Sequence, residues 1–372
     1  MSNNNDTSNI KGSFRNDRPQ EKIHVEGLGD VYDLGAWGFP YQKPEDNIIA
    51  PKSSLGARLN PELKAKGYLV QELNDGFYWV TNGGYDCAFV VSSEGVIAID
   101  APPNLGANLL KAIKEVTDKP VTHVIYSHWH SDHIGAADMF GPDVEIIAHA
   151  ITKELLERFP DPQRPVPTRT FVDELTLNIG GVLLELAYKG ANHTPGNIFI
   201  NAPRHRVLTK IDILSPGQSP FFHADASENI SGWLEAHDQI LEYDFDYLIT
   251  GHLTRYGTRE DVEAAREYFN DMLDLAWEVV KVTKPLSIYM QSGGWDYSWV
   301  GAENWLNAMA NYVTGKVLNK VSSNGETWAD RLAGATSMTK YHAHTIVESV
   351  RLERTHHGYV GKDPEAPFDF VY

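Results

Sequence analysis

Residues 127–133 read SHWHSDH and place three histidines and one aspartate within seven positions. They follow VTHVIYS, an apolar and β-branched run typical of a buried strand, so we expect these polar side chains on the loop beyond the strand. Near neutral pH, histidine is a neutral nitrogen ligand and aspartate an anionic oxygen ligand. Four such donors on one short loop can point at two adjacent metal positions. The chain must therefore adopt a fold in which a buried strand ends at a metal site.

The segments around this cluster alternate between strand and helix patterns. Short β-branched or aromatic runs between residues 68 and 99, separated by NDG, NGG and SSEG, predict a meander of strands. Helical spacing of apolar residues over 105–116 and a helix over 231–242 are separated by further strand-like runs. Strands followed by repeated strand–helix alternation predict a layered α/β or α+β body.

The character of the chain changes after residue 258. Thr258 and Asp261 have the spacing of a capping box, and apolar residues at helical spacing follow them. Two further helices are predicted around 305–317 and 339–353. We expect four regions, which are a disordered tail at 1–22, an irregular N-terminal arm at 23–67, a catalytic body at 68–258, and an all-helical C-terminal extension at 259–372 that serves as a lid or for dimerisation.

Charge and cysteine content exclude several classes of protein. Fifty acidic and 32 basic side chains give a net charge of −18, which disfavours nucleic acid as a ligand. The single cysteine, Cys87, excludes an internal disulfide framework and a multi-cysteine metal site. No apolar run is long enough to cross a bilayer, and the polar N-terminus lacks a secretory signal pattern. We therefore expect a cytoplasmic protein with no membrane partner and a small-molecule substrate.

The pattern His-x-His-x-Asp-His after a buried strand resembles the signature of the metallo-β-lactamase superfamily. Four more segments resemble the other motifs of that family, in the same order, between about residues 67 and 257. They are GVIAIDA ending near Asp100, NHTPGN with His193, VLTKID with Asp212, and YLITGH with His252. The resemblance implies an α+β fold, the four-layer αβ/βα sandwich of that family, with the N-terminal arm and the helical extension added.

The resemblance also implies a dinuclear metal site. His128, His130 and His193 would bind the first ion, and Asp132, His133 and His252 the second, with Asp212 bridging both. Asp100 would lie behind the ligands and hold the far N–H of a ligand histidine. Nitrogen and oxygen donors without sulfur suit two zinc ions, and iron or manganese fits the same set. Two positions depart from the family pattern, because Asn192 and Ile211 stand where glycine is more usual.

The reaction expected from such a site is hydrolysis. Two cations that share a water lower its pKa towards ~7, and the resulting hydroxide attacks a carbonyl that one metal polarises. The substrate would be a small ester, lactone, thioester or amide, and Asp132 or Asp212 would pass a proton to the leaving group. Tyr256 and Asn197 are weaker candidates for contacts with substrate. The alternatives are an iron-dependent redox member of the same fold, of the persulfide dioxygenase type, and a β-lactamase. A homo-oligomer formed through the C-terminal helices is a further expectation.

Overall fold

The computed structural model describes residues 22–25, 29–32, 60–253, 255–283 and 290–353. The chain divides into two compact units, residues 1–49 and residues 50–372. In the first unit, β1 (Lys22–Val25) and β2 (Gly29–Tyr32) form an antiparallel hairpin. The described part of the expected irregular arm therefore contains regular strands. The expected disordered tail, apart from Lys22, lies outside the described residues.

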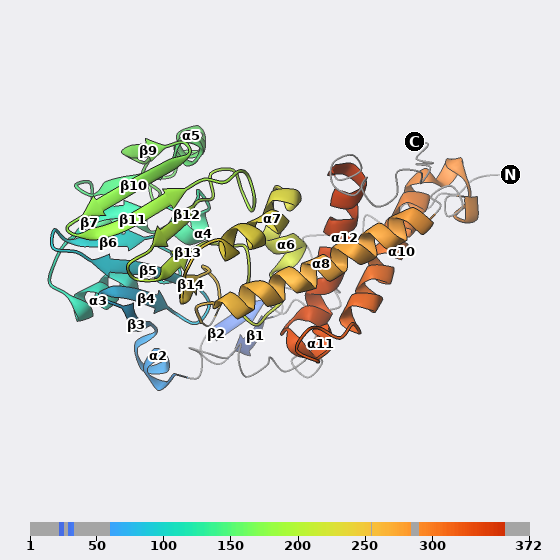
Figure 1. The fold of residues 1–372 in the computed structure, drawn as a ribbon, viewed down its shortest axis with the longest axis horizontal. Coiled ribbons are helices and arrows are strands. Elements are labelled where there is room, and N and C mark those ends of the chain that lie inside the picture. Colours follow the sequence, from blue (N-terminus) through green and yellow to red (C-terminus); the bar gives the residue numbers. More distant parts are fainter. Residues whose placement is uncertain (1–21, 26–28, 33–59, 254, 284–289, 354–372) are drawn as a thin grey trace. The chain divides into compact units, whose positions relative to one another are not determined.

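The second unit contains two β-sheets (Figure 1). The first has seven strands in sequence order, antiparallel from β3 to β6 and parallel from β6 to β9. The second has five strands, antiparallel from β10 to β13, with β14 parallel to β13. The strands are β3 (Leu69–Asn74), β4 (Phe77–Thr81), β5 (Asp86–Val91), β6 (Val96–Ile99), β7 (Val121–Ile125), β8 (Glu145–His149), β9 (Arg169–Phe171), β10 (Glu174–Ile179), β11 (Val182–Ala187), β12 (Phe199–Ala202), β13 (Val207–Thr209) and β14 (Tyr247–Ile249).

The helices are placed before, between and after these strands. A short helix precedes the first sheet, several lie between strands, and the C-terminal region of the described chain is helical. They are α2 (Pro61–Lys66), α3 (Ala107–Val116), α4 (Ser131–Ile134), η5 (Ala137–Phe140), α5 (Ala150–Arg158), α6 (Phe222–Ala226), α7 (Ile230–Leu241), α8 (Arg259–Val282), η6 (Trp295–Tyr297), α10 (Ser298–Leu318), α11 (Trp328–Arg331) and α12 (Ala335–Glu353).

Three hydrophobic clusters define the layers. Trp79 and Ile97 of the first sheet share one buried cluster with Leu184 and Ile200 of the second, so the two sheets pack face to face. The outer face of the first sheet packs against α3 and α5. The outer face of the second sheet shares a buried cluster with α7 and α8, and α10 and α12 pack against α8. The fold is therefore the αβ/βα sandwich that was predicted, with a helical appendage.

Local sequence signals explain where the long helices begin. The predicted capping box is present at the start of α8, because Thr258 and Asp261 satisfy each other's backbone N–H groups. The apolar positions that predicted a helix over 305–317 are buried in α10, and the helix predicted over 339–353 is α12. None of the helices in the described ranges is both long and apolar enough to cross a membrane.

The segment α6 is a left-handed turn. His223, Ala224, Asp225 and Ala226 have φ values of 53°, 54°, 62° and 55°. Each non-glycine residue in this conformation costs about 1–2 kcal/mol, so such a turn persists only where its surroundings hold it.

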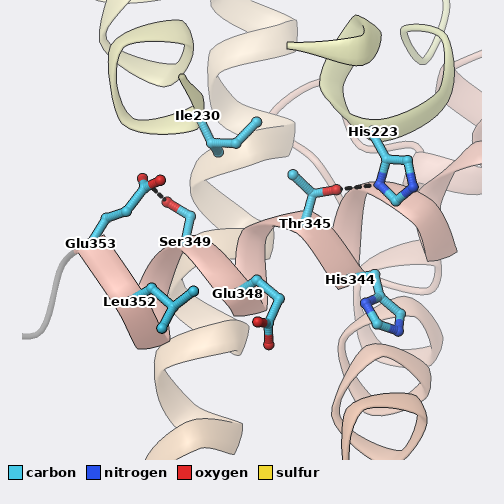
Figure 2. Close-up of a pocket in the computed structure, with 8 residues that line it drawn as sticks. All are labelled: His223, Ile230, His344, Thr345, Glu348, Ser349, Leu352 and Glu353. Carbon is cyan, nitrogen blue, oxygen red and sulfur yellow. Dashed lines mark hydrogen bonds between the residues drawn. The ribbon is translucent and has the colours of Figure 1, made fainter. Parts of the chain in front are cut away.

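The appendage helix α12 supplies part of that support. The backbone N–H of Ala224 donates to His342 Nδ1 at 2.9 Å, and His342 Nε2 lies 3.1 Å from the Pro220 carbonyl. Figure 2 shows a second contact on the same helix, between Thr345 and His223. His342 is fully buried, and burial lowers its pKa to about 3.

The buried imidazole of His342 predicts a pH dependence of stability. An unfolded histidine has a pKa near ~6.5, so the unfolded chain binds the proton first as pH falls. The stability that neutral His342 contributes is present above pH ~6.5 and is lost towards pH 3. Urea unfolding between pH 6.5 and 4.5 measures this effect. As the pH falls, the free energy of unfolding of His342→Gln should decrease by up to about 1 kcal/mol less per pH unit than that of wild type. The control His344→Gln should follow wild type. Equal pH slopes for wild type and His342→Gln would contradict the assignment.

Candidate metal centre

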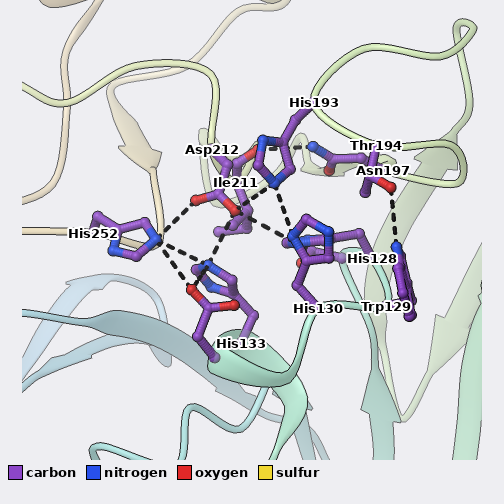
Figure 3. A network of polar contacts seen from close by, with 12 residues as sticks. His128, Trp129, His130, His133, His193, Thr194, Asn197, Ile211, Asp212 and His252 are labelled. Carbon is purple, nitrogen blue, oxygen red and sulfur yellow. Dashed lines mark hydrogen bonds and ion pairs between the residues drawn. The ribbon is translucent and has the colours of Figure 1, made fainter. Parts of the chain in front are cut away.

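The seven predicted ligands come from four places in the chain and lie close together, and Figure 3 labels all of them except Asp132. Strand β7 leads into His128 and His130, and Asp132 and His133 follow on α4. The other three residues come from the second sheet, where His193 precedes β12, Asp212 follows β13, and His252 follows β14. The structure differs from the prediction in one respect, because residues 131–134 form a helical turn and not a loop.

The ligand atoms fall into two groups. One atom from each of His128, His130, His193 and Asp212 lies within 4.8 Å of the others, and the same holds for Asp132, His133 and His252. The histidines and Asp132 divide as the family resemblance implies, and Asp212 falls in the first group.

The Asp212 carboxylate lies between the two groups. Its Oδ2 atom is 3.4 Å from His128 Nε2 and 3.1 Å from His133 Nε2. Its Oδ1 atom is 3.1 Å from His252 Nε2. Asp212 therefore faces imidazoles of both groups, as a bridging ligand would.

The donor atoms fit divalent cations. His133 Nε2 lies 3.1 Å from His252 Nε2, and His193 Nε2 lies 2.9 Å from His130 Nδ1. Two nitrogens held ~2.1 Å from one tetrahedral zinc ion lie roughly 3.4 Å apart, so both pairs are close to the spacing of ligands to a common ion. His128 Nε2 is fully buried and makes no hydrogen bond in the described part of the chain. A metal ion satisfies such a nitrogen directly.

Burial sets the charge state of the first group. It lowers the pKa of His128 well below its usual value and that of His193 to about 4, so both imidazoles are neutral at pH 7. Burial alone would raise the pKa of Asp212, but the imidazoles of His133, His193 and His252 hold it well below its usual range. Neutral imidazole and ionised carboxylate are the forms that bind metals.

Asp100 supports the loop from behind, with a different partner from the one predicted. Its Oδ1 atom accepts a hydrogen bond from the backbone N–H of Ser127 at 2.8 Å, at the start of the ligand loop. Its Oδ2 atom has no hydrogen-bond partner among the described residues. Asp100 therefore fixes the backbone just before His128, and does not hold a ligand ring through a hydrogen bond.

A buried lysine explains the unusual Asn192. The Oδ1 atom of Asn192 accepts from the backbone N–H of His193 at 2.8 Å and from Lys210 Nζ at 3.2 Å. Lys210 is fully buried and also donates to the Asn197 backbone carbonyl at 3.0 Å, with its Nζ atom 4.5 Å from the centre of the Phe199 ring. A glycine at position 192 would leave Lys210 without its side-chain acceptor. The asparagine departs from the family pattern and was noticed in the sequence, whereas Lys210 was missed.

The other departure, Ile211, packs against the last ligand loop. Gly251 has φ +90°, and a Cβ atom there would lie 2.7 Å from both the His133 ring and Ile211 Cγ2. Glycine at 251 therefore leaves room for the isoleucine beside His133.

Two buried carboxylic acids near the centre were missed. Asp86, in β5, accepts from the backbone N–H of Gly251 at 3.0 Å, and burial raises its pKa to about 7. A charged residue inside an otherwise apolar strand was the available signal. Asp225 lies in the left-handed turn, where burial and then the Asp212 carboxylate raise its pKa to about 7. The residues next to Asp225 in the sequence gave no indication that it would be buried.

The two weaker substrate candidates lie in supporting positions. The Tyr256 ring packs edge-on against Trp79, with centroids 5.5 Å apart, and against Tyr247 at 5.1 Å. Asn197 is fully buried and donates to the Ile211 carbonyl at 2.9 Å, next to Asp212. Both residues stabilise the body around the site.

The Lys210–Asn192 contact predicts strong coupling between two substitutions. Asn192→Gly should destabilise the metal-free protein by about 1–3 kcal/mol, because it removes one of the two acceptors of the buried Lys210 Nζ atom and the side-chain acceptor of the His193 N–H. Adding Lys210→Met should recover part of that loss, since the donor that lost an acceptor is then removed. Urea unfolding of the two single variants and the double variant measures the coupling energy. Strictly additive losses would show that the contact is energetically irrelevant.

Part of the chain is similar in sequence to known proteins. The model of the metallo-β-lactamase superfamily matches residues 80–252. The alpha subunit of 2,4-dinitroanisole O-demethylase from Nocardioides sp. is 32% identical over 187 residues, which cover 49% of this chain and 56% of that protein. This chain therefore aligns with little more than half of that relative's length. The type 2 metallo-β-lactamase of Bacteroides fragilis is 26% identical over 50% of this chain and 75% of its own length.

Among solved structures, the metallo-β-lactamase from Pontibacter korlensis matches with a TM-score of 0.47 and 21% sequence identity, covering 54% of this chain and 97% of that chain. The matched residues 80–252 run from β4 to His252 and so include all seven side chains of the centre. Residues 80–252 of the chain are therefore similar to the metallo-β-lactamase superfamily.

Proposed function

We propose that this protein is a dinuclear zinc hydrolase that cleaves a small ester, lactone, thioester or amide. The observation that carries the proposal is the Asp212 carboxylate, which is 3% exposed and faces imidazoles of both donor groups. Such an arrangement suits two ions held close together. Iron or manganese fits the same donors. Zinc is our first choice, because the ligands are nitrogen and oxygen atoms and no redox-active side chain is among them.

The seven residues would bind two ions. One ion would be held by His128, His130 and His193. The other would be held by Asp132, His133 and His252, and Asp212 would bind both. Bound metals would supply a water of lowered pKa and would polarise the scissile carbonyl.

Asp132 is the better of the two candidates for moving a proton. Its side chain is 42% exposed, whereas that of Asp212 is 3% exposed and enclosed by imidazoles. A group that hands a proton to a leaving group must reach that group in the bound substrate. Asp132 would therefore transfer the proton to the leaving group. Asp212 would bind both ions and so hold the two donor groups together.

A second candidate function is cleavage of an aryl methyl ether. It is favoured by the 32% identity with the alpha subunit of 2,4-dinitroanisole O-demethylase, and a match to the beta subunit at 24% identity supports it. The β-lactamase alternative is supported by the Bacteroides fragilis relative. The redox alternative would require iron in the purified protein and oxygen uptake with a persulfide.

We predict that one class in a substrate panel is turned over and that turnover depends on metal. The panel contains a lactone, a thioester, an aryl ester, a β-lactam and 2,4-dinitroanisole, followed by absorbance or by acid release. A chelator should abolish the activity, and zinc should restore it, because the ions supply the nucleophile. Carbonyl hydrolysis supports the first proposal, and release of 2,4-dinitrophenol alone supports the second. No turnover in the panel, with metal bound, would reject both.

Replacing the central carboxylate tests the dinuclear site. Asp212→Ala should lower metal content from about two ions per chain and reduce kcat/KM by at least about 100-fold, because Lewis-acid catalysis is worth several kcal/mol. Mass spectrometry of metals and steady-state kinetics measure the two effects. Asp238→Ala is the matched control, since Asp238 is 56% exposed and pairs with Arg266 on the surface. Full activity of metal-loaded Asp212→Ala would contradict the proposal.

A further inference from the structure

Among the described residues, part of the ligand cluster is exposed to solvent. The side chains of His128, His133 and Asp212 are 0%, 0% and 3% exposed. In contrast, the side chain of Asp132 is 42% exposed and that of His252 is 23% exposed. Asp132 and His252 are therefore ligands that a substrate from solvent can reach.

Tyr85 lies beside this exposed part of the cluster. Its ring centroid is 4.6 Å from that of His252 and 6.0 Å from that of His133. The residue is half-buried, so part of it remains accessible to a bound molecule. Its phenolic hydroxyl carries a proton that it can donate in a hydrogen bond.

The loop between β4 and β5 fixes Tyr85 in place. The carbonyl of Tyr85 accepts from Thr81 Oγ1 at 2.8 Å, and its N–H donates to Asn82 Oδ1 at 2.8 Å. Tyr85 also forms an isolated antiparallel bridge with His252. The next residue, Asp86, donates its N–H to the Gly251 carbonyl at 2.9 Å and accepts the Gly251 N–H at 3.0 Å. The aromatic ring is thus tied to the same backbone that carries His252.

Two other tyrosines near the centre are not placed for this task. Tyr126 follows β7 directly, but it is fully buried and donates to the Pro165 carbonyl at 3.0 Å. Tyr256, the tyrosine suggested by the sequence, packs between Trp79 and Tyr247.

We propose that Tyr85 is a substrate-contacting residue whose hydroxyl donates a hydrogen bond to the oxygen that becomes negatively charged when the scissile carbonyl is attacked. The inference rests on the proposed hydrolase function. The phenol keeps its proton throughout, and the charge leaves the oxygen when the bond to the leaving group breaks. A rigid donor at the site of developing charge stabilises the transition state more than the substrate.

The test compares Tyr85→Phe with Tyr78→Phe in metal-loaded protein. Phenylalanine at 85 keeps the ring packing and removes only the hydroxyl. Tyr78 is a matched control on the preceding strand, where its ring stacks on Phe89 at 5.0 Å. With the substrate found in the panel, Tyr85→Phe should lower kcat by about 100-fold with KM changed less than about threefold. Metal content should be unchanged, and Tyr78→Phe should match wild type.

A second readout does not need turnover. Inorganic phosphate imitates a tetrahedral oxyanion, and calorimetry should show about tenfold weaker binding to Tyr85→Phe than to wild type. Wild-type kcat or wild-type phosphate affinity in Tyr85→Phe would overturn the role of Tyr85 and leave the hydrolase proposal standing. Loss of metal in Tyr85→Phe would also overturn it, because the hydroxyl would then support the ligands. If wild type hydrolyses nothing, the hydrolase proposal fails, and the phosphate affinities alone decide whether Tyr85 contacts an oxyanion.

Discussion

The site is organised around a buried negative charge, the Asp212 carboxylate, which is surrounded by imidazoles. An isolated carboxylate at 3% exposure would be strongly destabilising, and it is tolerated because His128, His133, His193 and His252 lie within 3.1–3.4 Å of it. Those histidines are delivered by both sheets of the sandwich, so the carboxylate can be satisfied only when the two sheets pack in one register. Packing of the sheets and assembly of the site are therefore the same event.

Residues outside the ligand set support the metal centre through short, buried contacts. Helix α12 satisfies the backbone of the left-handed turn through His342, and that turn leads to Ser227, whose Oγ atom lies 3.5 Å from His193 Nδ1. The helical appendage thus touches the site through one intermediate segment, which a role confined to a lid or a dimer surface would not require. On the other side, Asp86 holds Gly251 and thereby His252. Each ligand loop has a buried polar group behind it.

Features of the fold and the site could be predicted from the sequence where they depend on residues close together in the chain. The seven donors were predicted because the motif fixes residue type and order, and the long helices because a capping box and apolar spacing are local signals. Asn192 was noticed as an anomaly, but its cause, Lys210, is 18 positions away and carries no local pattern. The contact of Asp86 with Gly251 spans 165 positions of the chain. Tyr85 could not be recognised from its sequence neighbours, because its position beside the centre depends on its contact with His252. Contacts that depend on sheet packing cannot be read from neighbouring residues.

The most direct test of the central claim is anomalous diffraction from crystals of the zinc-loaded protein, recorded on both sides of the zinc absorption edge. The account predicts two peaks about 3.5–4 Å apart on either side of the Asp212 carboxylate, one among His128, His130 and His193 and the other beside His133 and His252. A single peak, or peaks that do not share Asp212, would contradict it.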